Sequence, residues 1–431
     1  MYTSINQFKI KLDEEKRELY ITNYYGNAKE INIAPEYEIN GKIYKTTKIE
    51  NKFNFGTFCE TIKIPHTITL IGKNIFLNTS SLKKIIVDEN NPKYCSIDGV
   101  LYNKKQDLLI YCPDGYEKKS FAVPDKVRTI KENAFRNNKN IKEIFMNDNV
   151  EKIEAFAFYN CWSLEKIKLS NNINTFNRRV FADCHKLEEI NIPQKISKIA
   201  AYAFFANEKL KSFILNPSVS LLGFGTFKSS GIKDFTIDNN CKIDYINPDT
   251  LCFVHLNNFF INKDISFIPK SITNSTIENL YFSNEVTSKT INLNHLRSVF
   301  DTTEVSNIYI NKLNTEIKNL DKILEYCKEV GINLVYVEPL EQLENRYTYQ
   351  QINQIIKGYQ KGLLLNGLSP NISHETFRDL INIWDTDKCK ALNLINQLMK
   401  QKTLEEMLNI NKEISDLVNK KDVKQEERGD R

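Results

Sequence analysis

The sequence predicts an α/β solenoid, a curved stack of units of about 23 residues with an N-terminal β-hairpin cap and a small C-terminal all-α domain. A phenylalanine recurs every 23 residues in the middle of the chain, and apolar residues keep fixed positions around it. Toward the C-terminus the apolar spacing changes to three and four residues, which is typical of amphipathic helices. The recurring phenylalanines are Phe135, Phe158, Phe181, Phe204 and Phe227.

Alignment on these phenylalanines gives every column of the unit a residue type. After the phenylalanine comes an L-x-x-I-x-I pattern, as in Leu164, Ile167 and Leu169. This period and pattern are typical of leucine-rich repeats, in which a short strand is followed by a helical or irregular return. One unit buries about six apolar side chains, roughly 10 to 18 kcal/mol, against a backbone entropy cost of about 1 to 2 kcal/mol per residue. A single unit therefore cannot fold, and the units are expected to stack with parallel strands about 4.8 Å apart.

One column, three residues after each phenylalanine, holds small polar or sulfur-containing side chains. We expect them to lie where the chain turns and to satisfy inward-facing backbone groups, so that the cysteines among them belong to the scaffold. The column consists of Asn138, Cys161, Cys184, Asn207 and Ser230.

Two of the repeats resemble the BspA-type leucine-rich repeats. The stretches "IKENAFRNNKNIKEIFM" and "RRVFADCHKLEEINIP" follow the pattern I-x-x-x-A-F-x-x-C-x-x-L-x-x-I-x-I-P of that family, and the resemblance covers about 45–310. The stretch "VDENNPKYCSIDGVLYNKKQDLLIYCPDG" (87–115) resembles the hairpin that the family inserts between units. The resemblance implies a curved solenoid that recognises other macromolecules, in a family best known for cell-surface and host-interaction roles.

The repeats become irregular toward both ends of the chain. Residues 1–45 alternate apolar and polar side chains around turn residues and predict a β cap. The solenoid is expected over 46–310 with the hairpin insertion at about 88–123, followed by a closing helix and strand over 311–338, where Gly331 ends the helix. A helical domain is expected over 339–431, with Ser373 as a helix cap and a disordered, charged tail.

The composition predicts a soluble protein without a membrane span. The chain has 59 basic and 54 acidic residues and a net charge of +5. No run of about 18 apolar residues is present, and the first residues lack the apolar segment of a signal peptide. We expect a monomeric, cytoplasmic protein, which would reach a host cell or the surface only by a leaderless route.

The sequence predicts no catalytic site, no metal site and no cofactor. The nine cysteines form no C-x-x-C pair and are interpreted as reduced thiols, although Cys95 and Cys112 flank the insertion and would pair in an oxidising compartment. The five histidines lie in different units, and no nucleotide-binding or zinc-protease motif occurs. The alternative is an effector enzyme with Cys389 as its nucleophile, by analogy with bacterial effectors in which a helical ubiquitin-ligase domain follows leucine-rich repeats.

Binding of a protein partner is the function that the sequence favours. The outward positions of successive strands form one column, in which Phe145 and Ile214 are apolar, and Trp162 follows a turn. Exposed aromatic and apolar side chains are common anchors of interfaces. The predicted partner-binding residues are Phe145, Lys168, Asn191, Ile214 and Trp162, and the column is expected to continue to Thr236.

The neighbouring charged columns have a simpler explanation. Opposite charges meet in adjacent units, as in Lys142 with Glu165 and Glu143 with Lys166, so cross-strand pairing accounts for them. No stripe of lysine and arginine with interleaved aromatic residues is evident along the chain, which disfavours nucleic acid, although a ribonucleoprotein partner is kept as an alternative. The sequence thus predicts stoichiometric binding of a protein, as an adaptor, a host-interaction factor or an occluding inhibitor of another complex.

Overall fold

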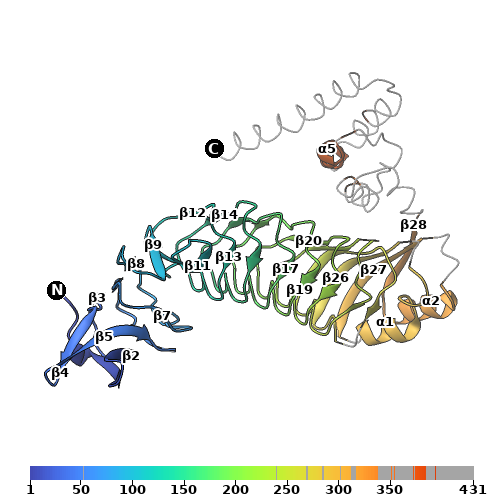
Figure 1. The fold of residues 1–431 in the computed structure, drawn as a ribbon. Coiled ribbons are helices and arrows are strands. Elements are labelled where there is room, and N and C mark those ends of the chain that lie inside the picture. The colour runs from blue at the N-terminus through green and yellow to red at the C-terminus, as the bar shows by residue number, and fades with distance from the viewer. Residues whose placement is uncertain are drawn as a thin grey trace, which may run out of the picture. The chain divides into compact units, whose positions relative to one another are not determined.

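The structure is a computed structural model and describes residues 1–51, 53–238, 240–267, 270–283, 286–300, 302–311, 317–337, 351, 354, 372, 374–384 and 394. The chain divides into two compact units. The first comprises Met1–Ile310 with Asn314–Val335, and the second comprises Asn311–Leu313 with Tyr336–Arg431. The repeats lie in the first unit (Figure 1).

The N-terminal strands form the hairpin that the alternating pattern predicts. After a short 3₁₀ helix, η1 (Ile5–Gln7), β1 (Phe8–Asp13) pairs antiparallel with β2 (Glu18–Tyr24). The Lys16 backbone N–H donates a hydrogen bond to Asp13 Oδ1 at 3.1 Å in the turn. The sheet continues through β5 (Lys42–Ile49), which pairs antiparallel with β4 (Glu36–Ile39) and parallel with β7 (Leu70–Ile71).

The first strands of successive repeats pair in parallel within three groups, as the period predicts. We refer to this set as the rung sheet; in Figure 1 its strands run side by side along the solenoid. Its strands form three groups, which are β3 (Glu30–Asn32), β6 (Thr61–Ile64) and β8 (Lys84–Val87); β12 (Ser120–Ala122), β14 (Glu143–Phe145), β16 (Lys166–Lys168) and β18 (Glu189–Ile190); and β20 (Ser212–Leu215), β22 (Asp234–Ile237), β24 (His255–Ile261), β26 (Ser275–Phe282), β27 (Thr303–Asn311) and β28 (Asn333–Val337).

A second set of strands lies on the return segments of the repeats. It begins with an antiparallel meander of β9 (Tyr94–Ile97), β10 (Val100–Asn103) and β11 (Leu108–Tyr111), in the region expected to hold the inserted hairpin. The following strands have two residues each, and β11 pairs in parallel with the first of them. They are β13 (Thr129–Ile130), β15 (Lys152–Ile153), β17 (Thr175–Phe176), β19 (Lys198–Ile199), β21 (Leu221–Leu222), β23 (Tyr245–Ile246) and β25 (Ser266–Phe267). The returns around Phe135 to Phe227 are turns rather than helices.

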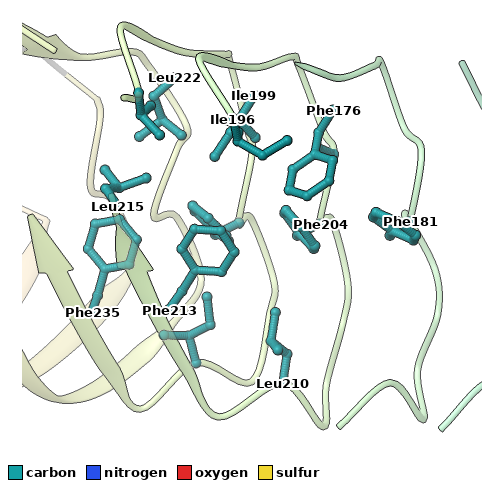
Figure 2. Close-up of a cluster of buried hydrophobic side chains, with 14 of the residues drawn as sticks. Phe176, Phe181, Ile196, Ile199, Phe204, Leu210, Phe213, Leu215, Leu222 and Phe235 are labelled. Carbon is teal, nitrogen blue, oxygen red and sulfur yellow. The ribbon is translucent and has the colours of Figure 1, made fainter. Parts of the chain in front are cut away.

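The recurring phenylalanines form a continuous stack through the core. The ring centroids of Phe158 and Phe181 are 5.4 Å apart, those of Phe181 and Phe204 are 5.6 Å apart, and those of Phe204 and Phe227 are 5.6 Å apart. All of these side chains are fully buried. Figure 2 shows Phe181 and Phe204 on neighbouring turns of the chain, with Phe213 and Phe235 packed from the rung strands. The predicted solenoid and its core column are confirmed.

The small polar column performs the role expected of it. Cys161 Sγ donates a hydrogen bond to the Phe135 carbonyl at 3.1 Å, and Cys184 Sγ donates one to the Phe158 carbonyl at 3.0 Å. Asn138 Nδ2 donates to the Pro113 carbonyl at 2.9 Å. These three side chains each satisfy a buried carbonyl of the preceding turn, whereas Ser230 Oγ is buried without a hydrogen-bond partner among the described residues.

Gly231 lies in a repeat that is one residue short, with 22 residues from Phe213 to Phe235, and its backbone lies close to that of the preceding turn. A Cβ atom on this residue would lie 1.7 Å from the Glu208 carbonyl oxygen, which is a backbone atom and cannot rotate away. We expect Gly231→Ala to destabilise the protein by more than about 1 kcal/mol, since the two turns would have to separate. Urea unfolding measures this, with Lys209→Ala as a control at an exposed residue of the neighbouring turn. Equal midpoints for the two variants would contradict the close approach.

Two helices lie near the end of the first unit, α1 (Leu293–Phe300) and α2 (Leu320–Glu329). The rung strand β28 follows α2, and Gly331 lies between them with a φ of 78°. The second unit contains α5 (His374–Trp384), in which Phe377 and Leu380 are buried. The predicted cap Ser373, the C-terminal tail and Cys389 lie outside the described residues.

Candidate functional site

The outward positions of the rung sheet carry the predicted apolar residues. Phe145 on β14 lies in register with Lys168 on β16, and Ile214 on β20 lies in register with Thr236 on β22. Their neighbours Ile144 and Phe213 point into the core, so the alternation of a β-strand places Phe145 and Ile214 outward. Phe145 is 37% exposed and Ile214 is 44% exposed.

Two members of the column differ from the expectation. Thr236 is only 2% exposed, so the prediction that it points into solvent is wrong; it lies in register between Ile214 and Phe260. Asn191 is exposed, but its amide bonds to the preceding turn, since the Leu169 N–H donates to Asn191 Oδ1 at 2.6 Å and Asn191 Nδ2 donates to the Leu169 carbonyl at 3.2 Å. The strand β18 ends at Ile190, and the Asn191 side chain makes the hydrogen bonds to the Leu169 backbone that a longer strand would make with its own backbone.

Trp162 lies at the turn before the rung strand and is therefore separate from the Phe145 column. It is 54% exposed, and its ring centroid lies 6.3 Å from that of His185 on the next turn. His185 Nδ1 in turn lies 3.1 Å from Glu208 Oε1. The structure thus places Trp162 at the rim of the rung sheet rather than on its face.

The charged side chains beside the column are largely paired with one another. Lys142 Nζ lies 2.8 Å from Glu165 Oε1, and Lys166 pairs with Glu189 on the following turn. The hydrogen bond from Lys142 lowers the pKa of Glu165, and the same contact raises the pKa of Lys142. Cross-strand pairing therefore accounts for these charges, as expected. It does not account for the exposed apolar side chains Phe145 and Ile214, nor for Ile86 on β8, which is 39% exposed.

The thiols of the described residues belong to the scaffold. All eight of them, including Cys95 and Cys112, are free, so the open question of that pair is answered by two separate thiols. Burial raises the pKa of Cys327 to about 11 and the pKa of Cys59 to about 12, which disfavours the thiolate that a nucleophile requires.

No group of three or more His, Cys, Asp or Glu side chains that could hold a metal ion occurs in the described part of the chain. Within that part, no helix has both the length and the apolar character needed to cross a bilayer.

A second surface, on the return side of the solenoid, was missed at the level of sequence. The Arg136 guanidinium lies 4.6 Å from the ring centroid of Tyr159 on the next turn, and the Arg179 guanidinium lies 4.8 Å from the ring centroid of Tyr202. The Phe156 ring centroid lies 5.9 Å from the Arg136 guanidinium, and the Phe205 ring centroid lies 5.9 Å from the Arg179 guanidinium. We name this surface the arginine–aromatic face; it comprises Arg136, Phe156, Tyr159, Arg179, Tyr202 and Phe205.

The expectation that no cationic stripe with interleaved aromatic residues exists is therefore wrong for this part of the molecule. The alternation runs across turns, with one member every 23 residues, and is invisible in linear order. Two aligned columns reveal it. The residues one position after each core phenylalanine are Arg136, Tyr159, Ala182, Phe205 and Lys228, and the residues two positions before it are Asn133, Phe156, Arg179, Tyr202 and Gly225.

The parallel rungs, the phenylalanine stack and the exposed sheet define a leucine-rich-repeat solenoid. Six copies of the BspA type leucine rich repeat region match within residues 23–97, 111–233 and 197–330. The chain belongs to this family, which confirms the resemblance drawn from its motifs. Among curated proteins, no sequence matches the chain significantly.

Several solved structures are similar to this chain at low sequence identity. A leucine-rich repeat protein from Bacteroides ovatus is 16% identical, covers 78% of this chain and 100% of that one, and has a TM-score of 0.43. A leucine rich cell surface protein from Faecalibacterium prausnitzii is 20% identical, with coverages of 55% and 95% and a TM-score of 0.32. The pneumococcal vaccine antigen PcpA is 17% identical, with coverages of 78% and 99% and a TM-score of 0.34.

Proposed function

We propose that this protein binds a protein partner stoichiometrically, without catalysing a reaction, through the outward face of the rung sheet around Phe145 and Ile214. Membership of the BspA-type family suggests a role in protein interaction or surface recognition. Solenoids of this class are typically non-catalytic. The proposal adds which face of the solenoid makes the contact.

The exposure of Phe145 and Ile214 on that face is the observation that supports the proposal. A stable solenoid needs apolar residues only at inward positions, and the outward positions nearby hold charged pairs. Burying a large apolar side chain at an interface contributes roughly 1.5 to 3 kcal/mol. Two such residues on a rigid sheet therefore supply anchors whose conformation is already fixed before binding.

Affinity purification of the tagged chain from native or host lysate, followed by mass spectrometry, tests the proposal. The variant Phe145→Asp with Ile214→Asp is expected to fold and to lose the stoichiometric partner, because each substitution places a charge at the centre of the contact. The matched control is Ile43→Asp with Leu70→Asp, which changes two exposed apolar residues of the N-terminal sheet by the same charge.

The outcomes separate the proposal from its alternatives. Retention of the same partner by the Phe145/Ile214 variant, with loss in the control, would place the contact elsewhere and contradict the proposal. Loss of the partner on nuclease treatment would favour a ribonucleoprotein. Retention of the partner's own activity in the purified complex would favour an adaptor, whereas inhibition at a 1:1 ratio would favour an occluding inhibitor.

A further inference from the structure

We infer that the arginine–aromatic face is a second binding surface, and that it takes an acidic segment of a partner protein. This inference goes beyond the proposed function, because the face lies on the return segments of the repeats and shares no residue with the Phe145 and Ile214 column. Four properties of the face carry the inference: its backbone conformation, its rigid guanidinium groups, its charge and the occupied faces of its rings.

Several bulky residues of the face have a backbone conformation that is unfavourable for them. The position two residues before the core phenylalanine has a positive φ in successive repeats, and Asn133 and Gly225 occupy it with φ of 61° and 58°. Phe156, Arg179 and Tyr202 occupy the same position with φ of 59°, 52° and 60°. Asparagine and glycine tolerate this region, whereas bulky residues adopt it only at a cost in free energy. Large side chains in three consecutive repeats therefore point to a role for the side chains themselves.

The guanidinium groups are held in place before any partner arrives. The Phe156 N–H donates to the Arg178 carbonyl at 3.0 Å, and the Arg179 N–H donates to the Ala201 carbonyl at 3.1 Å, so the turns are locked in register. The Nε atoms of Arg136 and Arg179 are buried without a hydrogen-bond partner among the described residues. Stacking against the rings lowers the conformational entropy that these side chains lose when they bind a carboxylate.

The charge of the return side is complementary to an acidic ligand. Residues 128–136, 151–160, 174–183, 195–206 and 218–229 hold nine Lys or Arg and four Asp or Glu, a net charge of +5. The intervening rung segments 137–150, 161–173, 184–194 and 207–217 hold seven Lys and six Asp or Glu, a net charge of +1, and no arginine. Within the described part of the chain, neither Arg136 nor Arg179 forms an ion pair with a carboxylate, whereas Arg128 pairs with Glu151 at 2.8 Å.

Arginine side chains cover the aromatic rings of the face, which favours a protein ligand over a nucleic acid. Nucleic-acid surfaces of this composition use open ring faces on which bases stack. Here Arg136 covers Tyr159 and Arg179 covers Tyr202, so these rings orient the guanidinium groups instead. Arg136 and Arg179 are two turns apart, about 10 Å along the stack. A peptide in the polyproline II conformation presents side chains three residues apart on one face, about 9 Å from each other. Arginine binds carboxylates through paired, charge-assisted hydrogen bonds.

Fluorescence anisotropy of the full chain with a labelled deca-glutamate peptide tests the inference, in 50 mM and 150 mM salt. Arg136→Gln with Arg179→Gln is expected to weaken binding at least tenfold, and Arg136→Lys with Arg179→Lys at least threefold, because lysine keeps the charge but not the planar donors. Lys168→Gln with Lys211→Gln removes the same charge from the rung side and is expected to change binding less than twofold. A deca-glutamine peptide measures binding that does not depend on charge.

The same assay distinguishes failure of this inference from failure of the proposed function. Absence of peptide binding, or equal losses in the arginine and lysine control variants, would overturn the inference. Tighter binding of a labelled oligo-deoxythymidine that the arginine variant abolishes would overturn it in favour of nucleic acid. The Phe145→Asp with Ile214→Asp variant is expected to bind the peptide like the unaltered protein, whatever it does to the partner of the rung sheet. Circular dichroism of every variant verifies folding.

Discussion

Replacing Phe204 by alanine is expected to destabilise the solenoid by roughly 3 to 5 kcal/mol. The Phe204 ring is fully buried and contacts Phe181, Phe213 and Phe227 at centroid distances of 5.6, 5.2 and 5.6 Å. Alanine would leave a cavity in the middle of the stack, and turns on either side cannot close it because their backbones are hydrogen-bonded in register. Urea unfolding followed by circular dichroism measures the loss.

The central position of Phe204 in the solenoid also predicts a change in the shape of the unfolding transition. In a solenoid each turn contacts only its neighbours, so a weakened central turn is expected to lower the midpoint and also to broaden the transition. Phe58→Ala is the control, since Phe58 is 68% exposed and its loss is expected to cost less than about 0.5 kcal/mol. A midpoint for Phe204→Ala equal to that of the control would show that the turns repack independently of the phenylalanine stack.

The second large effect is a loss of stability as the pH rises, caused by Asp114. This carboxyl is almost fully buried and accepts a hydrogen bond from the Tyr111 hydroxyl at 2.5 Å. Burial raises the pKa of Asp114 to about 7, although the hydrogen bond from Tyr111 and the charges of Lys139 and Arg136 oppose the rise. In the unfolded chain the same group has its ordinary pKa of about 3.9.

The direction of the change in the free energy of unfolding with pH follows from proton binding. Between about pH 4 and pH 7 the folded protein holds a proton on Asp114 that the unfolded chain has already released, so the free energy of unfolding falls as the pH rises. The contribution is fully present below pH 4 and is lost by the time the pH passes 7. Its total is on the order of 4 kcal/mol, with a slope of at most about 1.4 kcal/mol per pH unit.

Asp114→Asn isolates this contribution, because asparagine keeps the shape of the side chain and cannot ionise. The variant is expected to match the unaltered protein near pH 4 and to be more stable at pH 8, with thermal unfolding at each pH as the measurement. The acidic groups whose pKa ion pairing lowers, such as Glu60 and Glu165, act in the opposite direction in both proteins and cancel in the comparison. Parallel stability curves from pH 4 to pH 8 would contradict the buried, protonated carboxyl.

Much of the fold follows from the sequence because the repeat is redundant. The core phenylalanine, the strand pattern and the small polar column each recur five times, so a single ambiguous residue does not change the alignment. The N-terminal hairpin was also predictable, since β1 and β2 alternate apolar and polar side chains around the turn at Asp13. The repeat pattern is compatible with helical or irregular returns, and the structure has turns there. The rings of Phe158 and Phe181 on successive returns stack at 5.4 Å, whereas packed α-helices lie about 8 to 10 Å apart.

The candidate site was only partly predictable. Strand alternation was sufficient to place Phe145 and Ile214 outward, but exposure also depends on the neighbours across the sheet. Thr236 shows this, because it occupies an outward position and is nevertheless buried, in register between Ile214 and Phe260. Asn191 shows a second reason, since its side chain can replace a missing backbone pair only where the strand β18 stops short.

The sequence by itself determined the class of this protein, which is a repeat solenoid of the BspA-type family with a phenylalanine core. Periodicity alone is enough for this, because a unit that cannot bury its apolar face must stack on its own copies. Only the tertiary structure decided which side chains meet across turns: the pairing of Lys142 with Glu165 was predicted from adjacency, but the stacking of Arg136 on Tyr159 was not. Residues 23 positions apart become neighbours at about 4.8 Å in the stack. The direction of their side chains depends on the positive φ of residues such as Phe156 and Tyr202, and local sequence preference does not predict a positive φ for bulky residues.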